Sequence, residues 1–171
     1  VIEGIQWTVE YGMDIANFSL GASQGTEALA DAVKAAKAGG VAIIAATGNS
    51  GRAVGVPAAY PEVLAVAASD SSDRVAYFSS RGPEVDVIAP GVGIRSTYMG
   101  GGYRNLSGTS MACPHVAGLA ALAVARGAGG IDAVRAALAS AATKIPEVPA
   151  EQQGAGLIDA ERLVNNAGQA L

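Results

Sequence analysis

Apolar residues along the chain occur in two different patterns. Over residues 1–12 and 29–40 they recur every three or four positions, and each segment ends in glycine, as amphipathic helices commonly do. Residues 41–46 (Val-Ala-Ile-Ile-Ala-Ala) are instead apolar without a break, which is typical of a strand buried on both faces of a parallel sheet. Similar apolar stretches predict further strands at 14–20, 63–68 and 85–89.

Helical patterns dominate the second half of the chain. Residues 111–126 form the most apolar stretch and predict a buried helix, and residues 131–142 and 159–166 predict two amphipathic helices. Glycine-rich segments at 48–55 and 100–102 predict loops, the second of them flexible. Because strands alternate with helices and no repeat or linker interrupts the chain, the pattern predicts one α/β domain built in layers.

Composition narrows the possible classes of protein. Of the 171 residues, 50% are apolar and only 5% are aromatic, so the core must consist mainly of Ala, Val, Ile and Leu. The net charge of −4 and the lack of a basic cluster argue against a nucleic-acid partner. No apolar run reaches the roughly 18 residues that a membrane span requires. The glycine-rich loops match neither the Gly-x-Gly-x-x-Gly fingerprint nor the Gly-Lys-Ser phosphate loop, which argues against a nucleotide-binding protein.

The strongest chemical signal is Ser110, which stands where a glycine-containing loop enters the apolar helix. Free N–H groups and a partial positive charge at a helix N-terminus suit a nucleophile whose reaction creates an oxyanion. Pro114 has no N–H, so the carbonyl of Ser110, four residues earlier, loses its usual helical partner. For a bare Gly-Thr-Ser, an ordinary serine cap would be the simpler interpretation.

The longer string around Ser110 is more specific. Residues 105–118 read Asn-Leu-Ser-Gly-Thr-Ser-Met-Ala-Cys-Pro-His-Val-Ala-Gly, which resembles the active-serine motif of the subtilisin family. Further segments resemble that family in the same chain order, at 17–21, 46–51, 78–83, 86–91 and 154–160. The resemblance implies that residues 1–171 are a partial subtilase catalytic domain. Its fold would be a three-layer α/β sandwich with a mostly parallel sheet, without its N-terminal third, in a secreted protein.

The resemblance also implies the catalytic roles. Ser110 would attack the peptide carbonyl, and the side chain of Asn49, together with the backbone N–H of Ser110, would bind the oxyanion. Taken alone, Gly48-Asn49 would be interpreted as a plain turn.

The substrate-binding residues follow from the same resemblance. Substrate backbone would lie along Ser19, Leu20 and Gly21, which would bind it by strand addition. The pocket for the side chain before the scissile bond would be lined by Ala46, Thr47, Gly48 and Gly55. Because these residues are small and uncharged, we expect an open pocket that broadly prefers large apolar side chains.

Catalysis by a serine needs a base to accept the proton of Ser110 and a carboxylate to orient that base. His115 is the only histidine of the sequence. On a helix, its position five residues after Ser110 turns its side chain away by about 140° and about 7.5 Å along the axis, so we expect it to be structural. No aspartate lies in a segment that resembles the family's Asp motif. We therefore expect a missing N-terminal segment to supply both groups, and this chain alone to be inactive.

These observations predict a serine-type endopeptidase fragment, which in the complete parent hydrolyses peptide bonds through an acyl-enzyme. The alternative is an inactive peptide-binding subunit, or one half of a split enzyme, with the same fold. A pure binding module would have no reason to keep Asn49 and Ser110 together.

The chemistry itself requires no cofactor or metal. By resemblance to the family, Glu84 and Asp86 would join the carbonyls of Ala58, Tyr60 and Val63 in a weak site for Ca²⁺ or Na⁺. A solvated acidic pair is the alternative. The single cysteine, Cys113, cannot form an internal disulfide, and we expect it to be a buried, inert thiol.

Overall fold

A parallel sheet forms the centre of the molecule in the computed structural model, which describes residues 1–166. The four strands lie in chain order, and each pairs in parallel with the next. They are β1 (Ile15–Phe18), β2 (Ala42–Ala46), β3 (Val63–Ser69) and β4 (Val85–Pro90). Every residue of β2 and β3 is buried, as the unbroken apolar run at 41–46 predicts.

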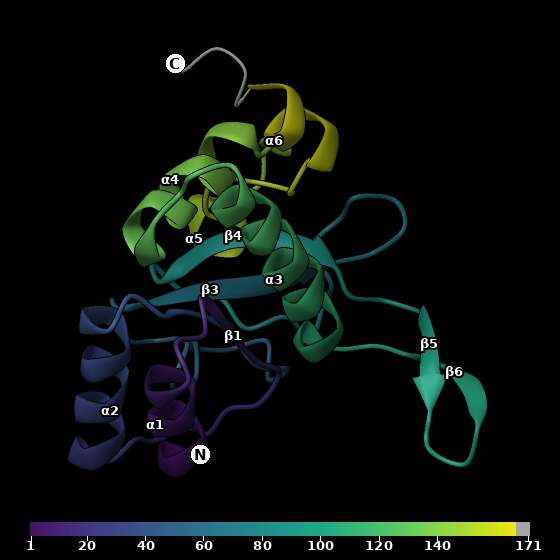
Figure 1. The fold of residues 1–171 in the computed structure, drawn as a ribbon. Coiled ribbons are helices and arrows are strands. Elements are labelled where there is room, and N and C mark those ends of the chain that lie inside the picture. Colours follow the sequence, from purple (N-terminus) through teal and green to yellow (C-terminus); the bar gives the residue numbers. More distant parts are fainter. Residues whose placement is uncertain (167–171) are drawn as a thin grey trace.

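Helices cover both faces of this sheet (Figure 1). Alternate residues of β2 point to opposite faces: Ile43 packs with α1 (Ile2–Glu10) and α2 (Glu27–Ala38), whereas Ile44 packs with α3 (Thr109–Ala125) and α4 (Gly130–Ala141). A further helix, α6 (Ala160–Asn166), packs on α3 and α4. The predicted three-layer α/β sandwich with a mostly parallel sheet is therefore confirmed.

Local signals explain where the helices begin and end. The hydroxyl of Thr26 accepts a hydrogen bond from the N–H of Leu29 at 3.2 Å and so caps α2, which ends at Gly39. In α3 the buried residues are mostly small, which lets this helix lie close against the sheet.

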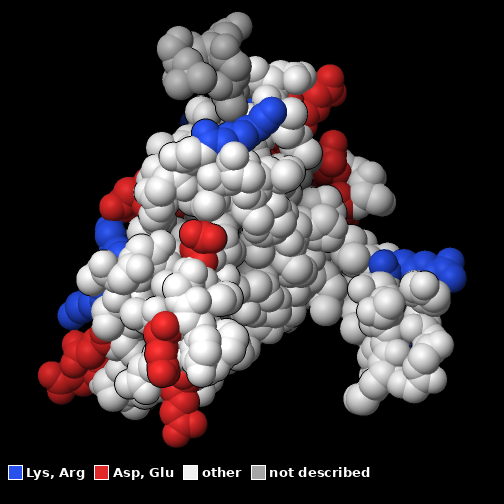
Figure 2. Space-filling model, in the orientation of Figure 1, with Lys and Arg blue, Asp and Glu red and all other residues white. Residues whose placement is uncertain are grey.

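A β-hairpin and one short helix were not predicted. Around the glycines at 100–102, where the sequence predicts only a flexible loop, β5 (Ile94–Tyr98) and β6 (Gly102–Leu106) form an antiparallel hairpin that stands away from the sheet (Figure 1). Its residues are largely exposed, so no apolar pattern marks it. Arginines stack across it on tyrosines, and basic side chains stand out on the hairpin in Figure 2. The other is α5 (Ala150–Gln153), a single turn too short to show a period.

Within the described residues, no single helix is long and apolar enough to cross a membrane. Only α3 and α4 taken together reach that length and composition, with a bend of 107° between them.

Candidate active site

Ser110 lies in the first turn of α3, close to the end of β1. Its hydroxyl donates a hydrogen bond of 3.0 Å to the carbonyl of Ser19. The hydroxyl of Ser19 donates in return to the carbonyl of Ser110, at 2.8 Å, and accepts from the side-chain amide of Asn17 at 3.0 Å. The carbonyl that Pro114 deprives of its helical partner is thus bonded by a residue 91 positions away in the sequence.

Asn49 lies in the loop that leaves β2, and a threonine holds its side chain. Its Oδ1 accepts hydrogen bonds from the backbone N–H of Thr109, at 2.8 Å, and from the Thr109 hydroxyl, at 3.0 Å. The same hydroxyl accepts from the N–H of Gly48 at 3.1 Å. Because Oδ1 is bonded to Thr109, the Nδ2 group of Asn49 remains the donor for another acceptor.

Thr109 was missed by the sequence reasoning, although it stands inside the Gly-Thr-Ser string. A threonine next to a candidate nucleophile was the only available signal. What it does there depends on β2 and α3 meeting, and the sequence does not show that contact.

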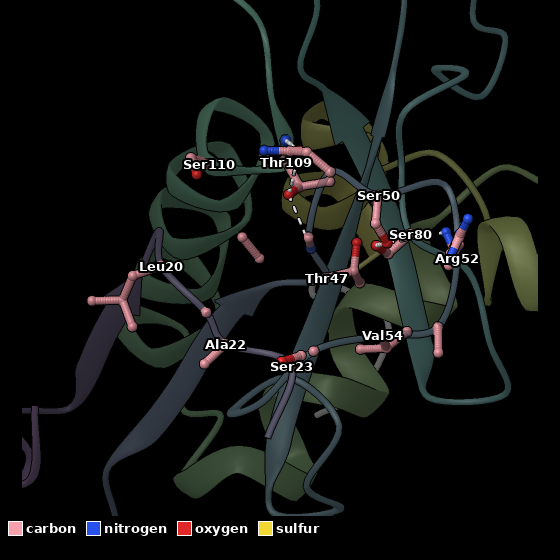
Figure 3. Close-up of a pocket in the computed structure, with 16 residues that line it drawn as sticks. Leu20, Ala22, Ser23, Thr47, Ser50, Arg52, Val54, Ser80, Thr109 and Ser110 are labelled. Atoms are coloured by element: carbon pink, nitrogen blue, oxygen red, sulfur yellow. Dashed lines mark hydrogen bonds between the residues drawn. The ribbon is translucent and has the colours of Figure 1, made fainter. Parts of the chain in front are cut away.

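A pocket of about 510 Å³ opens beside these groups (Figure 3). Eight of the predicted site residues line it: Leu20, Gly21, Ala46, Thr47, Gly48, Asn49, Gly55 and Ser110. Ser19 is not part of the wall and is joined to the site by its bonds to Ser110. A Cβ added at Gly55 would lie 2.8 Å from the carbonyl of Ala22, so glycine is required for this close approach.

The wall of the pocket is more polar than the sequence led us to expect. Arg52 lines it, as do the hydroxyl residues Ser23, Ser50 and Ser80. The expectation of a pocket without a fixed charge was therefore wrong. Arg52 follows Asn49 by three residues and lines the pocket because the loop after β2 folds back, with the N–H of Gly55 bonded to the carbonyl of Thr47 at 3.0 Å.

His115 is bonded to its own helix. Its Nδ1 lies 2.8 Å from the carbonyl of Met111, and no hydrogen bond joins it to Ser110 within the described residues. This arrangement agrees with the structural role expected for it. Residues 1–166 also contain no group of three or more His, Cys, Asp or Glu side chains that could hold a metal ion.

Four of the five proposed cation-binding residues help to line a separate hollow of about 320 Å³: Tyr60, Val63, Glu84 and Asp86. Ala58 is not part of its wall. An arginine occupies part of its wall. Arg135 pairs with the carboxylate of Asp86 at 3.0 Å and donates to the carbonyl of Val63 at 2.8 Å. Burial raises the pKa of Asp86, against the opposing effects of the Ala65 N–H and of Arg135. Two of the five expected ligand groups are therefore already bonded to a cationic side chain, and the metal site stays a prediction.

Comparison with known proteins agrees with this architecture. Residues 1–156 match the subtilase family. The chain belongs to the subtilase family. It is 44% identical over 163 residues to alkaline elastase YaB of Bacillus sp. (strain YaB), and 44% identical over 167 residues to subtilisin DY of Bacillus licheniformis. Each match covers 94% of this chain, but only 43% and 60%, respectively, of the two relatives.

Solved structures lead to the same family. The patellamide maturation protease PatA superposes with a TM-score of 0.86 at 33% identity, covering 99% of this chain and 68% of the other. The prenylagaramide maturation protease PagA gives 0.85 at 31% identity, covering 97% and 66%. The subtilase chain described here thus spans about two thirds of each of these structures.

Proposed function

We propose that this subtilase chain is the serine-bearing part of an endopeptidase that hydrolyses peptide bonds through an acyl-enzyme. One observation carries the proposal: the hydroxyl of Ser110 and the amide of Asn49 lie on the same pocket, with Asn49 oriented by Thr109. A nucleophile beside a rigidly held neutral donor is the arrangement that acyl transfer requires.

In the proposed reaction, Oγ of Ser110 attacks the carbonyl carbon of the peptide and its proton passes to a base. The oxyanion is stabilised by Nδ2 of Asn49 and by the backbone N–H of Ser110. The C–N bond then breaks, the amine leaves with the proton from the base, and water hydrolyses the ester. The carbonyl of Ser19, to which Ser110 is bonded here, is released when Ser110 turns to the base and can then accept from substrate backbone.

The base must come from outside this sequence. The one histidine of the chain is bonded to the Met111 carbonyl. We therefore expect residues 1–171 alone to show no peptide hydrolysis, and we infer that a segment with the Asp and His completes the site, either in the same polypeptide or in a second chain of a split enzyme. Secretion is proposed from the family resemblance, and detection of the protein in culture medium would test it.

A fluorophosphonate probe, which reacts with activated serines, tests the proposed function. The full-length protein should be labelled and should cleave a casein substrate, and Ser110→Ala should lose both properties. Ser107→Ala is the matched control, because Ser107 lies three residues earlier and its hydroxyl accepts only from the N–H of Gly93 in the described part of the chain. Equal labelling of wild type and Ser110→Ala would refute the assignment.

A further inference from the structure

The pocket beside Ser110 has one charged side chain among the described residues that line it, Arg52. Its backbone is held on both sides, because its N–H donates to Ser50 Oγ at 3.2 Å and its carbonyl accepts from the N–H of Arg81 at 2.7 Å. Its guanidinium is exposed and pairs with no carboxylate in residues 1–166. Arg52 is therefore an exposed cationic residue at the edge of the pocket, on the side of Ser80 (Figure 3).

Hydroxyl groups occupy the same part of the wall. Ser50 Oγ and Ser80 Oγ lie 3.1 Å apart, and one of the two can donate to a further acceptor. Thr47 is 0% exposed, and its Oγ1 has no hydrogen-bond partner within the described residues. Figure 3 draws its hydroxyl pointing in the direction of Ser80. A buried hydroxyl without a partner is costly, so a ligand that offers it an acceptor gains affinity.

These groups select a type of side chain. A carboxylate only accepts hydrogen bonds and carries a negative charge, so it complements both the hydroxyl donors and the guanidinium. A cationic side chain would be repelled by Arg52. The glycines at 21, 48 and 55 leave the pocket, about 510 Å³ in volume, open to a side chain that is long enough to reach its wall.

We propose that this pocket binds an acidic side chain, with Glu preferred over Asp, at the residue immediately before the scissile bond. The inference rests on the proposed peptidase function and names its substrate class. It replaces the broad apolar preference expected from the sequence, because that expectation did not include Arg52, Ser50 or Ser80.

A peptide series that differs only at the residue before the scissile bond tests this specificity on the full-length protein. With Glu, Gln, Leu or Lys at that position, kcat/KM should be about tenfold higher for Glu than for Gln, the size of one charge-assisted hydrogen bond. The Glu/Gln ratio should fall as NaCl rises, because the guanidinium is exposed. The substrate with Lys should be the poorest.

Two variants and a matched control separate the contributions of charge and hydroxyl. Arg52→Gln should bring the Glu/Gln ratio close to one, and Thr47→Val, which keeps the shape, should lower it about threefold or more. Arg81→Gln removes a neighbouring arginine that does not line the pocket and should keep the ratio. Equal rates for Glu and Gln, or a ratio that persists in Arg52→Gln, would overturn the inference while leaving the peptidase assignment intact. Absence of any cleavage and of fluorophosphonate labelling would overturn both.

Discussion

Replacing Ser19 with alanine tests whether the structure explains how a proline is tolerated beside the nucleophile. Pro114 cannot donate to the carbonyl of Ser110, and the Ser19 hydroxyl takes over that bond at 2.8 Å. The Ser19→Ala change removes this donor and leaves both the Ser110 carbonyl and the Asn17 amide without their partner.

The expected loss follows from the burial of the bond. A typical hydrogen bond contributes about 0.5–1.5 kcal/mol, and leaving a buried carbonyl unsatisfied costs about 1–3 kcal/mol. The Ser19–Ser110 bond is only partly buried, so water can replace some of it, and we expect a loss of about 1–2 kcal/mol in the free energy of unfolding. At about 2–4 °C per kcal/mol for a chain of this size, Tm should fall by about 2–8 °C.

Calorimetric unfolding of the full-length protein measures this effect. Ser140→Ala is the matched control, since the Ser140 hydroxyl donates to the Ala137 carbonyl at 2.8 Å on an exposed helix surface. That change should cost less than about 0.5 kcal/mol.

A double-mutant cycle with Pro114→Ala then tests the mechanism itself. Alanine at 114 restores an N–H that can bond the Ser110 carbonyl within the helix. Ser19→Ala should therefore cost less in the Pro114→Ala background, by more than the roughly 0.3–0.5 kcal/mol within which independent sites are additive. Strict additivity would refute the argument that the Ser19 hydroxyl replaces the missing helical donor.

Three further predictions concern the full-length protein. Asn49→Ala should lower kcat by about 10²–10³ with little change in KM, as removal of such a donor does in subtilisin itself, and an unchanged kcat would exclude Asn49 from the oxyanion site. Peroxide should inactivate the enzyme by oxidising Met111 rather than Cys113, because burial raises the pKa of the Cys113 thiol to about 12. Protection by Cys113→Ser but not by Met111→Ala would contradict this prediction. If the weak cation site exists, calcium should raise Tm by about 2–4 °C, and Glu84→Gln should abolish this rise. An unchanged calcium response in the double variant Glu84→Gln/Asp86→Asn would place the site elsewhere.

Much of the fold could be predicted because buried segments have a recognisable local pattern of apolar residues. The run at 41–46 is apolar at every position because β2 is covered on both faces. The segment at 111–126 is apolar because α3 packs against the sheet and other helices, although one face of α3, which includes His115, Gly118 and Leu122, is exposed. The β5–β6 hairpin has no such apolar pattern, because its strands are largely exposed. The contacts between its strands pair arginine with tyrosine, and both residue types are common on protein surfaces.

The candidate active site, too, could be predicted only in part. Ser110 and Asn49 could be named from the sequence because each stands in an extended motif, at the start of a helix and after a strand. The partners of these two residues, and of Asp86, could not be named. Ser19 meets Ser110, Thr109 orients Asn49, and Arg135 neutralises Asp86, across separations of 91, 60 and 49 residues.

The sequence by itself therefore determined the type and order of the main elements, the family, and the two candidate catalytic residues. Tertiary structure alone decided which polar groups bond one another, that Arg52 lines the pocket, and that the Thr47 hydroxyl is buried without a hydrogen-bond partner among residues 1–166. The physical reason is that the spacing of apolar residues within one segment indicates which of its residues face the core, so each segment can be interpreted without the others. A hydrogen bond between distant segments depends on how strands and helices dock, and no single segment encodes that.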